Sequence, residues 1–392
     1  MNGSTPSAAA APRLASLDAL RGFDMFWIAG GGQVILSLVT AAKCPSLAWV
    51  PPQFEHVPWE GFHFIDLIFP LFLFMIGVSI PYAFAKRLAR GDRLWRLYGH
   101  IFLRAVILFT LGMMITGNLL TYNVQKFQIY SVLQMLALGY LVAAVIFLNF
   151  RWPWQIVVTV LMLLAYWALL AFVPCPGHVI GVVKDHCNIG DWLNDWIVGD
   201  WQGQFRLGWI VGILGHASTA MLGVFAGGLL RSAKSERSKV LWLVGLGVVC
   251  LLGGMFWGGW IARWFPGIVL FGEDWSRWPI WCPIIKNRWT SAYALYAGGW
   301  SYLLLALFYL VIDVWGLRRW AFPFVVIGAY SLAAYMAWQL GNSAFYHVAQ
   351  VLLGGLGQYV GPWQGAVLAA GAFGGLWLLL WYMYRNKTFI RA

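Results

Sequence analysis

Charged residues are scarce in this chain. They make up 10% of its 392 residues, while 61% of the residues are hydrophobic; a soluble domain has roughly 25% charged and about 45–50% apolar residues. A soluble fold is therefore not expected. Acidic residues are the rarer charged group, with 14 Asp and Glu against 26 Lys and Arg. The cations flank apolar segments instead of forming one soluble basic patch, which argues against nucleic-acid binding and makes them a topology signal.

Several common motifs are missing as well. The chain contains no P-loop, no G-x-S-x-G and no H-E-x-x-H sequence, which disfavours ATPase and hydrolase functions. Its start, MNGSTPSAAAAPRLA, is small and polar and does not have the basic start followed by an apolar core that defines a signal peptide. We expect residues 1–15 to form a disordered cytoplasmic tail.

Cysteine is also rare, with five residues in the chain. Four of them fall on the predicted outer side, and the fifth, Cys250, falls within a predicted helix. A disulfide between Cys175 and Cys187 would suit an oxidising compartment. Free thiols fit equally well, because spacing does not fix connectivity. The other two outer cysteines are Cys44 and Cys282.

Long apolar runs recur between short polar connections, and each run has about the 20 residues that a membrane helix needs. The sequence therefore predicts an all-α, polytopic transmembrane bundle of about ten helices. Basic segments, such as 86–96 and 231–239, follow alternate helices, so the positive-inside rule places both termini in the cytoplasm. The predicted spans are 23–42, 64–85, 101–118, 130–149, 154–173, 209–230, 240–262, 291–314, 322–348 and 364–384.

Two predicted outer loops, 174–208 and 263–290, are too long to be simple turns. Both are rich in Trp, Gly and Pro, and part of either loop could re-enter the bundle, where irregular backbone is tolerated. Because no soluble segment separates the spans, we expect residues 16–392 to form a single membrane domain.

Ionisable residues at a membrane span are candidate sites, because they are costly in lipid. Asp66 stands two residues into the second predicted span and follows His56, Glu60 and His63. An imidazole beside a carboxylate can act as a general base. Alternatively, Asp66 caps the helix, where its charge suits the N-terminal dipole. The two histidines are seven residues apart without a ligand motif, so no metal site is expected.

Other polar residues allow two interpretations each. Arg21 could pair with Asp18, three residues earlier on the same helix face, or bind a phosphate group bidentately. Lys286 and Trp289 could frame a substrate at the outer mouth of the eighth span, or be a snorkelling cation and an interfacial Trp. For Gln134, as for Asn342, the default interpretation is an interhelical hydrogen bond.

Four stretches follow one another along nearly the whole chain: RLASLDALRGFDMF, EHVPWEGFHFIDLIFPLFLFMIGVSI, IYSVLQMLALGY and PIIKNRWTSAYAL. In order and spacing they resemble successive motifs of the heparan-alpha-glucosaminide N-acetyltransferase family and its bacterial relatives. Asp313 and Asn342 also fit the family pattern. The L-D-x-L-R-G start is shared with membrane acyltransferases that modify surface polysaccharides.

This resemblance implies transmembrane acetyl transfer, in a bacterial inner membrane, from cytoplasmic acetyl-CoA to a glucosamine amine on the far side. The matching motif places the active-site histidine on His56 and its neighbouring acid on Asp66. His56 would then serve as general base or as acetyl acceptor. Arg21 and Gln134 are assigned to acetyl-CoA binding. The residues assigned to substrate are Trp59, Glu60, Gln33, Lys286, Trp289 and Asn342.

Two positions depart from the family pattern. Gly32 stands where the human-like pattern has an active-site Asn, although Gln33 could supply the amide after a one-residue shift, and Met135 replaces a common Arg. The alternatives are an O-acyltransferase of surface polysaccharide and a transporter or non-catalytic membrane protein. Expected partners are a small-molecule or glycan substrate and membrane lipids, with a homodimer left open. We expect neither a metal nor nucleic acid.

Overall fold

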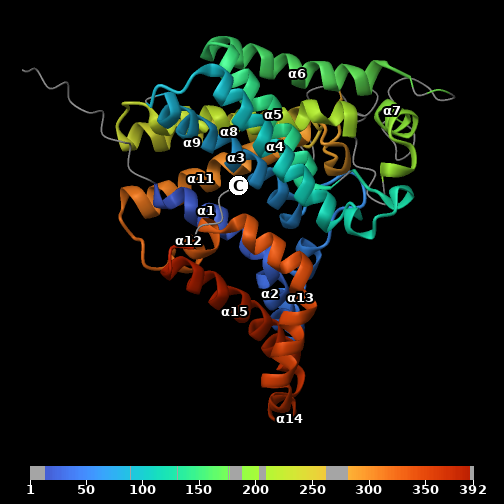
Figure 1. Ribbon diagram of the computed structural model, residues 1–392, viewed down its shortest axis with the longest axis vertical. Coiled ribbons are helices and arrows are strands. Elements are labelled where there is room, and N and C mark those ends of the chain that lie inside the picture. Colours follow the sequence, from blue (N-terminus) through green and yellow to red (C-terminus); the bar gives the residue numbers. More distant parts are fainter. Residues whose placement is uncertain are drawn as a thin grey trace, which may run out of the picture.

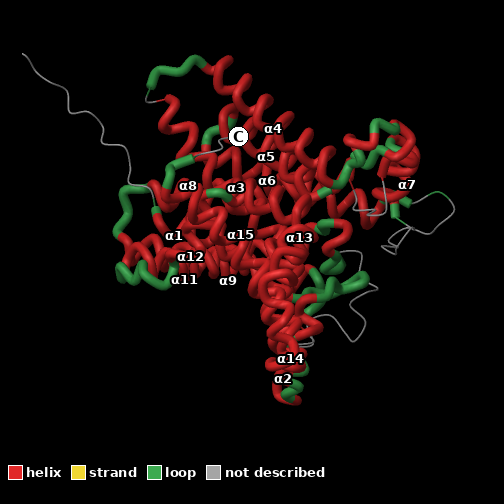
Figure 2. The backbone as a smooth tube through the Cα atoms, turned by 60° about the horizontal axis from the view of Figure 1, so that its bottom comes forward, coloured by secondary structure: helices red, strands yellow, loops and turns green. Residues whose placement is uncertain are grey.

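The computed structural model describes residues 14–88, 90–129, 131–174, 176, 188–202, 209–261 and 281–388. Within these ranges the regular structure is helical, and extended pairing is limited to an isolated bridge between Glu60 and Ile285 (Figure 2). Nine stretches are long and apolar enough to cross a membrane. The last of them, Ser331–Arg385, holds two long helices and so includes two of the predicted spans. The prediction of an all-α polytopic bundle is confirmed.

The first span bends in its middle. Helices α1 (Ala15–Phe26) and α2 (Gly32–Ala42) are joined by a π-helical turn, Trp27–Gly31. Gly30 has a φ of 101° in this turn, a conformation that L-residues other than glycine rarely adopt. Most of the predicted tail, residues 1–13, lies outside the described residues.

The middle of the chain forms a layered bundle in which a few helices are enclosed by others. In the most apolar window of α3, 78% of the residues are buried, against 17% in α9. Since the bundle is a membrane protein, the exposed apolar faces of the outer helices suit contact with lipid. The helices of this region are α3 (Phe64–Leu88), α4 (Leu94–Ile115), α5 (Val132–Asn149), α6 (Trp152–Phe172), α8 (Trp209–Arg231), α9 (Glu236–Trp257) and α11 (Ser291–Phe308).

The C-terminal helices differ from the prediction in one respect. A single span was expected at 322–348, but the helix breaks at Tyr330 into α12 (Phe322–Ala329) and α13 (Ser331–Leu353). The backbone of Tyr330, with φ −129° and ψ 31°, lies outside the helical region. After the short α14 (Gly357–Val360), α15 (Gln364–Arg385) runs back along α13. Together with α2, these helices project from the rest of the bundle (Figure 1).

Small residues allow the helix backbones to approach closely, as is typical of membrane bundles. A Cβ atom on Gly328 of α12 would overlap the carbonyl oxygen of Asp18 in α1, and one on Gly22 would overlap the carbonyl oxygen of Phe324. The same holds between α3 and α8, where Gly77 faces the Ala220 carbonyl group. These contacts fix how α1 and α3 are held against their neighbours.

Parts of both long loops that were predicted on the outer side fall within the described residues. The first loop contains α7 (Ile189–Ile197), which packs at the edge of the bundle (Figure 1). The end of the second loop is buried: Ile284 and Ile285 are both 0% exposed. The predicted Cys175–Cys187 pair lies outside the described residues, whereas Cys44, Cys250 and Cys282 are free thiols.

Candidate active site

The loop before α3 is tied to the first turn of that helix. Gln53 accepts a hydrogen bond from the backbone N–H of Phe64 (3.1 Å), and the carboxylate of Asp66 accepts one from the backbone N–H of His63 (3.0 Å). These bonds satisfy N–H groups that lack partners within the helix. Asp66 therefore does act as a cap, and the same turn orients its other carboxylate oxygen toward the loop.

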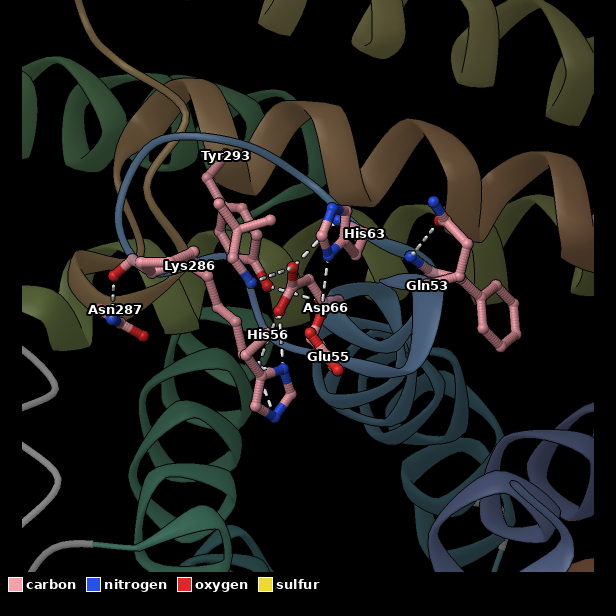
Figure 3. Close-up of polar contacts among 11 residues, drawn as sticks. Gln53, Glu55, His56, His63, Asp66, Lys286, Asn287 and Tyr293 are labelled. Carbon is pink, nitrogen blue, oxygen red and sulfur yellow. Dashed lines mark hydrogen bonds and ion pairs between the residues drawn. The ribbon is translucent and has the colours of Figure 1, made fainter. Parts of the chain in front are cut away.

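Three ionisable side chains meet at that oxygen (Figure 3). Oδ1 of Asp66 lies 2.8 Å from Nδ1 of His56 and 3.0 Å from Nζ of Lys286. Nζ of Lys286 is in turn 2.7 Å from Nδ1 and 3.2 Å from Nε2 of His56. Residues 220 positions apart in the sequence thus form one cluster, in which a carboxylate is shared by an imidazole and an ammonium group.

The members of the cluster differ in burial. The side chain of Asp66 is 0% exposed, that of Lys286 is 13% exposed and that of His56 is 59% exposed. Burial lowers the pKa of Lys286, and the charge of Asp66 opposes this shift. Tyr293 of α11 donates a hydrogen bond to the backbone carbonyl oxygen of Asp66 (2.7 Å). Tyr293 therefore holds the backbone of Asp66, whose carboxylate is buried, while the imidazole of His56 is exposed.

A short extended pairing brings Lys286 to this place. Glu60 and Ile285 form an antiparallel bridge, and the N–H of Gly61 donates to the carbonyl oxygen of Ile284 (3.0 Å). Asn287 donates to the carbonyl oxygen of Pro58 (3.4 Å). The side chain of Glu60 accepts a hydrogen bond from Nε1 of Trp260 (3.3 Å). Pairing between the two motif loops thus decides which residues share the site.

Arg288 connects this pairing to the outer loop. It is 1% exposed, and its Nη2 lies 2.6 Å from Oδ2 of Asp191 in α7. Its guanidinium carbon is 5.0 Å from the centroid of the Trp59 ring, a distance suited to a cation–π contact. The hydroxyl of Tyr166 in α6 donates to the carbonyl oxygen of Arg288. Three residues with these contacts were not selected from the sequence, because no local pattern indicates that they meet the motif residues: Asp191 and Tyr166, which bond to Arg288, and Tyr293, which bonds to Asp66.

Other predicted substrate residues lie elsewhere. Trp289 is 2% exposed and stacks on His216 with 4.0 Å between ring centroids. Gln33 is exposed on α2 and contacts Ser37, and Asn342 is exposed on α13. Gly32 is nearer to the motif loop: a Cβ built on it would lie 3.4 Å from the ring of Phe54 and 2.9 Å from the carbonyl oxygen of Trp27.

A cavity of about 500 Å³ lies further along α3, toward the end opposite Asp66. Arg21, Arg87, Arg104 and His100 line it, so it is rich in nitrogen donors and positive charge. Arg21 donates to the hydroxyl of Ser79 and lies 3.6 Å from Asp18. The apolar part of the cavity lining includes Phe72, Met75, Ile76, Leu108 and Leu133.

The cavity and the His56 cluster lie at different depths. Asp66 and Arg87 are 21 residues apart on α3, which corresponds to about 31 Å at 1.5 Å per residue, close to the hydrocarbon thickness of a bilayer. Among the α3 residues that line the cavity, Phe72 is nearest to Asp66 in the sequence, six residues away. Gln134 is 0% exposed beside Ser131 and is next to Leu133 of the lining.

The described residues contain no group of three or more His, Cys, Asp or Glu side chains arranged to hold a metal ion. The cluster of Asp66, His56 and Lys286 offers a carboxylate, an imidazole and an amine. Such a set can accept, hold and return a proton.

Comparison with known proteins agrees with the motifs. A family model described as a domain of unknown function (DUF5009) matches residues 13–178. The human heparan-alpha-glucosaminide N-acetyltransferase is 25% identical over 394 aligned positions, covering 85% of this chain and 54% of the human protein. The mouse protein of the same name is 26% identical over 342 positions, covering 74% of this chain and 50% of its own length. The chain thus spans about half the length of these relatives.

Proposed function

We propose that this chain, a relative of the heparan-alpha-glucosaminide N-acetyltransferases, is a transmembrane acetyltransferase. It transfers the acetyl group of cytoplasmic acetyl-CoA to an amine of an amino sugar or glycan on the other side of the membrane. The observation that carries the proposal is the contact of His56 with Asp66 and Lys286, which lie in two separate family-like motifs. Similarity to proteins named as N-acetyltransferases supports the reaction class.

His56 supplies the base. Asp66, 2.8 Å from Nδ1, holds the ring by a hydrogen bond and stabilises its protonated form. Nε2 then accepts the proton that the amine loses as it attacks the thioester carbonyl carbon. In a two-step variant, Nε2 itself takes the acetyl group and passes it to the amine. Both routes use the same exposed imidazole edge.

The cavity lined by Arg21, Arg87 and Arg104 is the proposed site of the coenzyme A phosphates. Arginine forms strong, bidentate hydrogen bonds with phosphate. The cavity extends along α3 toward Asp66, so the slender pantetheine arm would bring the thioester toward His56. Gln134, beside the lining, is assigned to the same cofactor. When bound, acetyl-CoA supplies the activated acetyl group.

The acceptor is proposed to bind at the open side of His56. Glu60 and Trp59 suit it because a carboxylate can hold an amine or hydroxyl group and an aromatic ring can pack on a sugar. Lys286 is proposed to contact the reacting group. For Gln33, Trp289 and Asn342, which lie on other elements, a substrate contact stays a proposal. We place the protein in the bacterial inner membrane, surrounded by lipid, with the homodimer as an assembly to be tested.

The test is an assay of the purified full chain in nanodiscs with labelled acetyl-CoA and a panel of amino sugars. We expect an acetylated amine, and we expect His56→Ala to lower kcat by at least about 100-fold. His347→Ala, an exposed histidine on α13, is the matched control and should retain activity. Absence of acceptor acetylation across the panel, or full activity in His56→Ala, would contradict the proposal.

The same assay separates the remaining possibilities. An ester product that hydroxylamine cleaves would identify an O-acyltransferase, the second candidate that the L-D-A-L-R-G start favours. Uptake of a sugar into proteoliposomes without acetyl-CoA would instead indicate a transporter. Labelled acetyl-protein trapped without acceptor, and lost in His56→Ala, would establish the two-step route.

A further inference from the structure

Lys286 occupies an unusual position for a lysine beside a base. Its side chain is 13% exposed, and its Nζ contacts both the carboxylate of Asp66 (3.0 Å) and the imidazole nitrogens of His56 (2.7 and 3.2 Å). The neighbouring residues are held as well, since Asn287 bonds to Pro58 and Arg288 to Asp191. The ammonium group is therefore fixed next to the atoms that would carry out acyl transfer.

The charge of Lys286 limits which substrate atom it can bind. An amino-sugar acceptor is itself cationic before it loses its proton, and two ammonium groups repel each other. Coenzyme A phosphates are proposed to bind near Arg87, at the far end of α3. In the reaction itself, negative charge develops first on the acetyl oxygen, when the thioester carbonyl becomes tetrahedral. It develops later on the leaving sulfur, which is neutralised by the proton from His56.

Gly32 has no side chain that could stabilise the negative charge on the acetyl oxygen. The family resemblance places an active-site Asn there, whereas Gly32 has no side chain to donate a hydrogen bond. Any Cβ at this position would lie 2.9 Å from the carbonyl oxygen of Trp27, which is too close without a shift of the helix. The amide of Gln33 contacts Ser37 on the exposed side of α2.

We propose that the ammonium group of Lys286 donates a hydrogen bond to the acetyl oxygen and stabilises the oxyanion formed during acetyl transfer. This inference rests on the proposed function and assigns a catalytic role to a residue otherwise described only as a substrate contact. Asp66 serves two groups in this arrangement: it orients His56, and it keeps the proton on Lys286.

The acceptor reacts in its neutral form, after the ammonium group has lost one proton to water. The lone pair of this neutral amine forms the new C–N bond, and the π electrons of the carbonyl move to oxygen, which Lys286 stabilises. His56 takes the proton released by the amine. The oxyanion then re-forms its double bond, the C–S bond breaks with its electron pair on sulfur, and the thiolate takes the proton from His56. The products are the amide and coenzyme A.

The test compares Lys286→Met and Lys286→Arg with a matched control, Lys126→Met. Lys126 lies in an exposed turn that is far in sequence from the first residues of α3. We expect kcat to fall about 100- to 1000-fold in Lys286→Met, with KM for both substrates changed less than about threefold. Lys286→Arg should recover part of kcat, and methylammonium should rescue Lys286→Ala in a concentration-dependent manner.

Folding is checked by coenzyme A affinity, which is expected to match the wild type. The thermal midpoint of Lys286→Met is expected to fall, because the buried Asp66 loses one of its two cationic neighbours, but to stay above the assay temperature. A change in acceptor KM with unchanged kcat would overturn the inference and make Lys286 a binding residue, and so would equal activity of Lys286→Met and Lys126→Met. A wild-type protein without acetyl transfer would refute the proposed function itself, which distinguishes the two failures.

Discussion

Arg288 and Asp191 form a buried ion pair, with 2.6 Å between Nη2 and Oδ2, across 97 residues of sequence. One partner is two residues after Lys286, and the other lies on α7 of the first outer loop. Because Arg288 also packs over Trp59, the pair connects three segments: α7, the turn that carries Lys286 and the loop that carries His56 and Trp59. It holds the turn that carries Lys286 in the position seen in Figure 3.

The first prediction concerns this pair. Asp191→Ala should destabilise the protein by about 3–5 kcal/mol, because it removes a carboxylate from a buried guanidinium. The double variant Asp191→Leu, Arg288→Met should recover much of this loss, since two apolar groups replace two charges. Thermal unfolding in nanodiscs measures both. Asp195→Ala, on the exposed side of α7, is the control, and an equally large loss there would contradict the assignment.

A second prediction follows from the lowered pKa of Lys286. The folded protein releases this proton at a lower pH than the unfolded chain, whose lysine has the ordinary pKa of 10.5. The unfolded state therefore binds more protons between the two pKa values, and the free energy of unfolding should rise with pH in that range. Activity should fall over the same range, because the oxyanion loses its ammonium donor. Lys286→Met should abolish the rise in stability, and a rise that persists would exclude Lys286 as its source.

The third prediction tests the cationic cavity. Arg104→Gln should raise KM for acetyl-CoA by about 10-fold or more, since it removes a charged hydrogen bond worth roughly 1.5–3 kcal/mol. Its kcat should stay close to the wild-type value because Arg104 is proposed to hold the coenzyme A phosphates and not the reacting acetyl group. Arg319→Gln, an exposed arginine between α11 and α12, serves as control. If the affinity for coenzyme A is unchanged in Arg104→Gln, the cavity is not the binding site of this cofactor.

Membrane orientation gives the fourth prediction. Cys44 is exposed just beyond α2, and a hydrogen bond with Ser46 lowers the pKa of its thiol, which makes the thiolate more available. A membrane-impermeant maleimide should label it from outside in intact cells, in a chain with Cys175 and Cys187 replaced by Ser. Cys44→Ser in that background should lose the label. Labelling seen only with inverted vesicles would show that the membrane topology is opposite to the predicted one.

The fifth prediction concerns helix packing. Gly328→Ala should destabilise the bundle by roughly 1–3 kcal/mol or more, because its methyl group would overlap the backbone carbonyl of Asp18. Gly228→Ala is a matched control, since a Cβ there meets no atom within 4 Å. The two variants are compared by their thermal midpoints and by the fraction that stays folded in detergent, and both values should be lower for Gly328→Ala. Equal midpoints would show that α1 and α12 can move apart without cost.

The sequence by itself determined the membrane class, the positions of most helices and the loop that holds the candidate base. Hydrophobic length is a local property, so a run of about 20 apolar residues identifies a span wherever it packs. The break at Tyr330 was not predicted, because no proline stands at that position. The break follows the residue Gly328, which packs against the backbone of α1, a contact that the local sequence does not show.

Only the tertiary structure decided which of the selected residues meet. His56 and Asp66 are neighbours in sequence, but Lys286 reaches them through the pairing of Glu60 with Ile285. Trp289 looked equivalent to Lys286 in the same motif, yet it points into the core against His216. A turn of three residues sends consecutive side chains in different directions, and the contacts that select those directions come from segments far away in the chain.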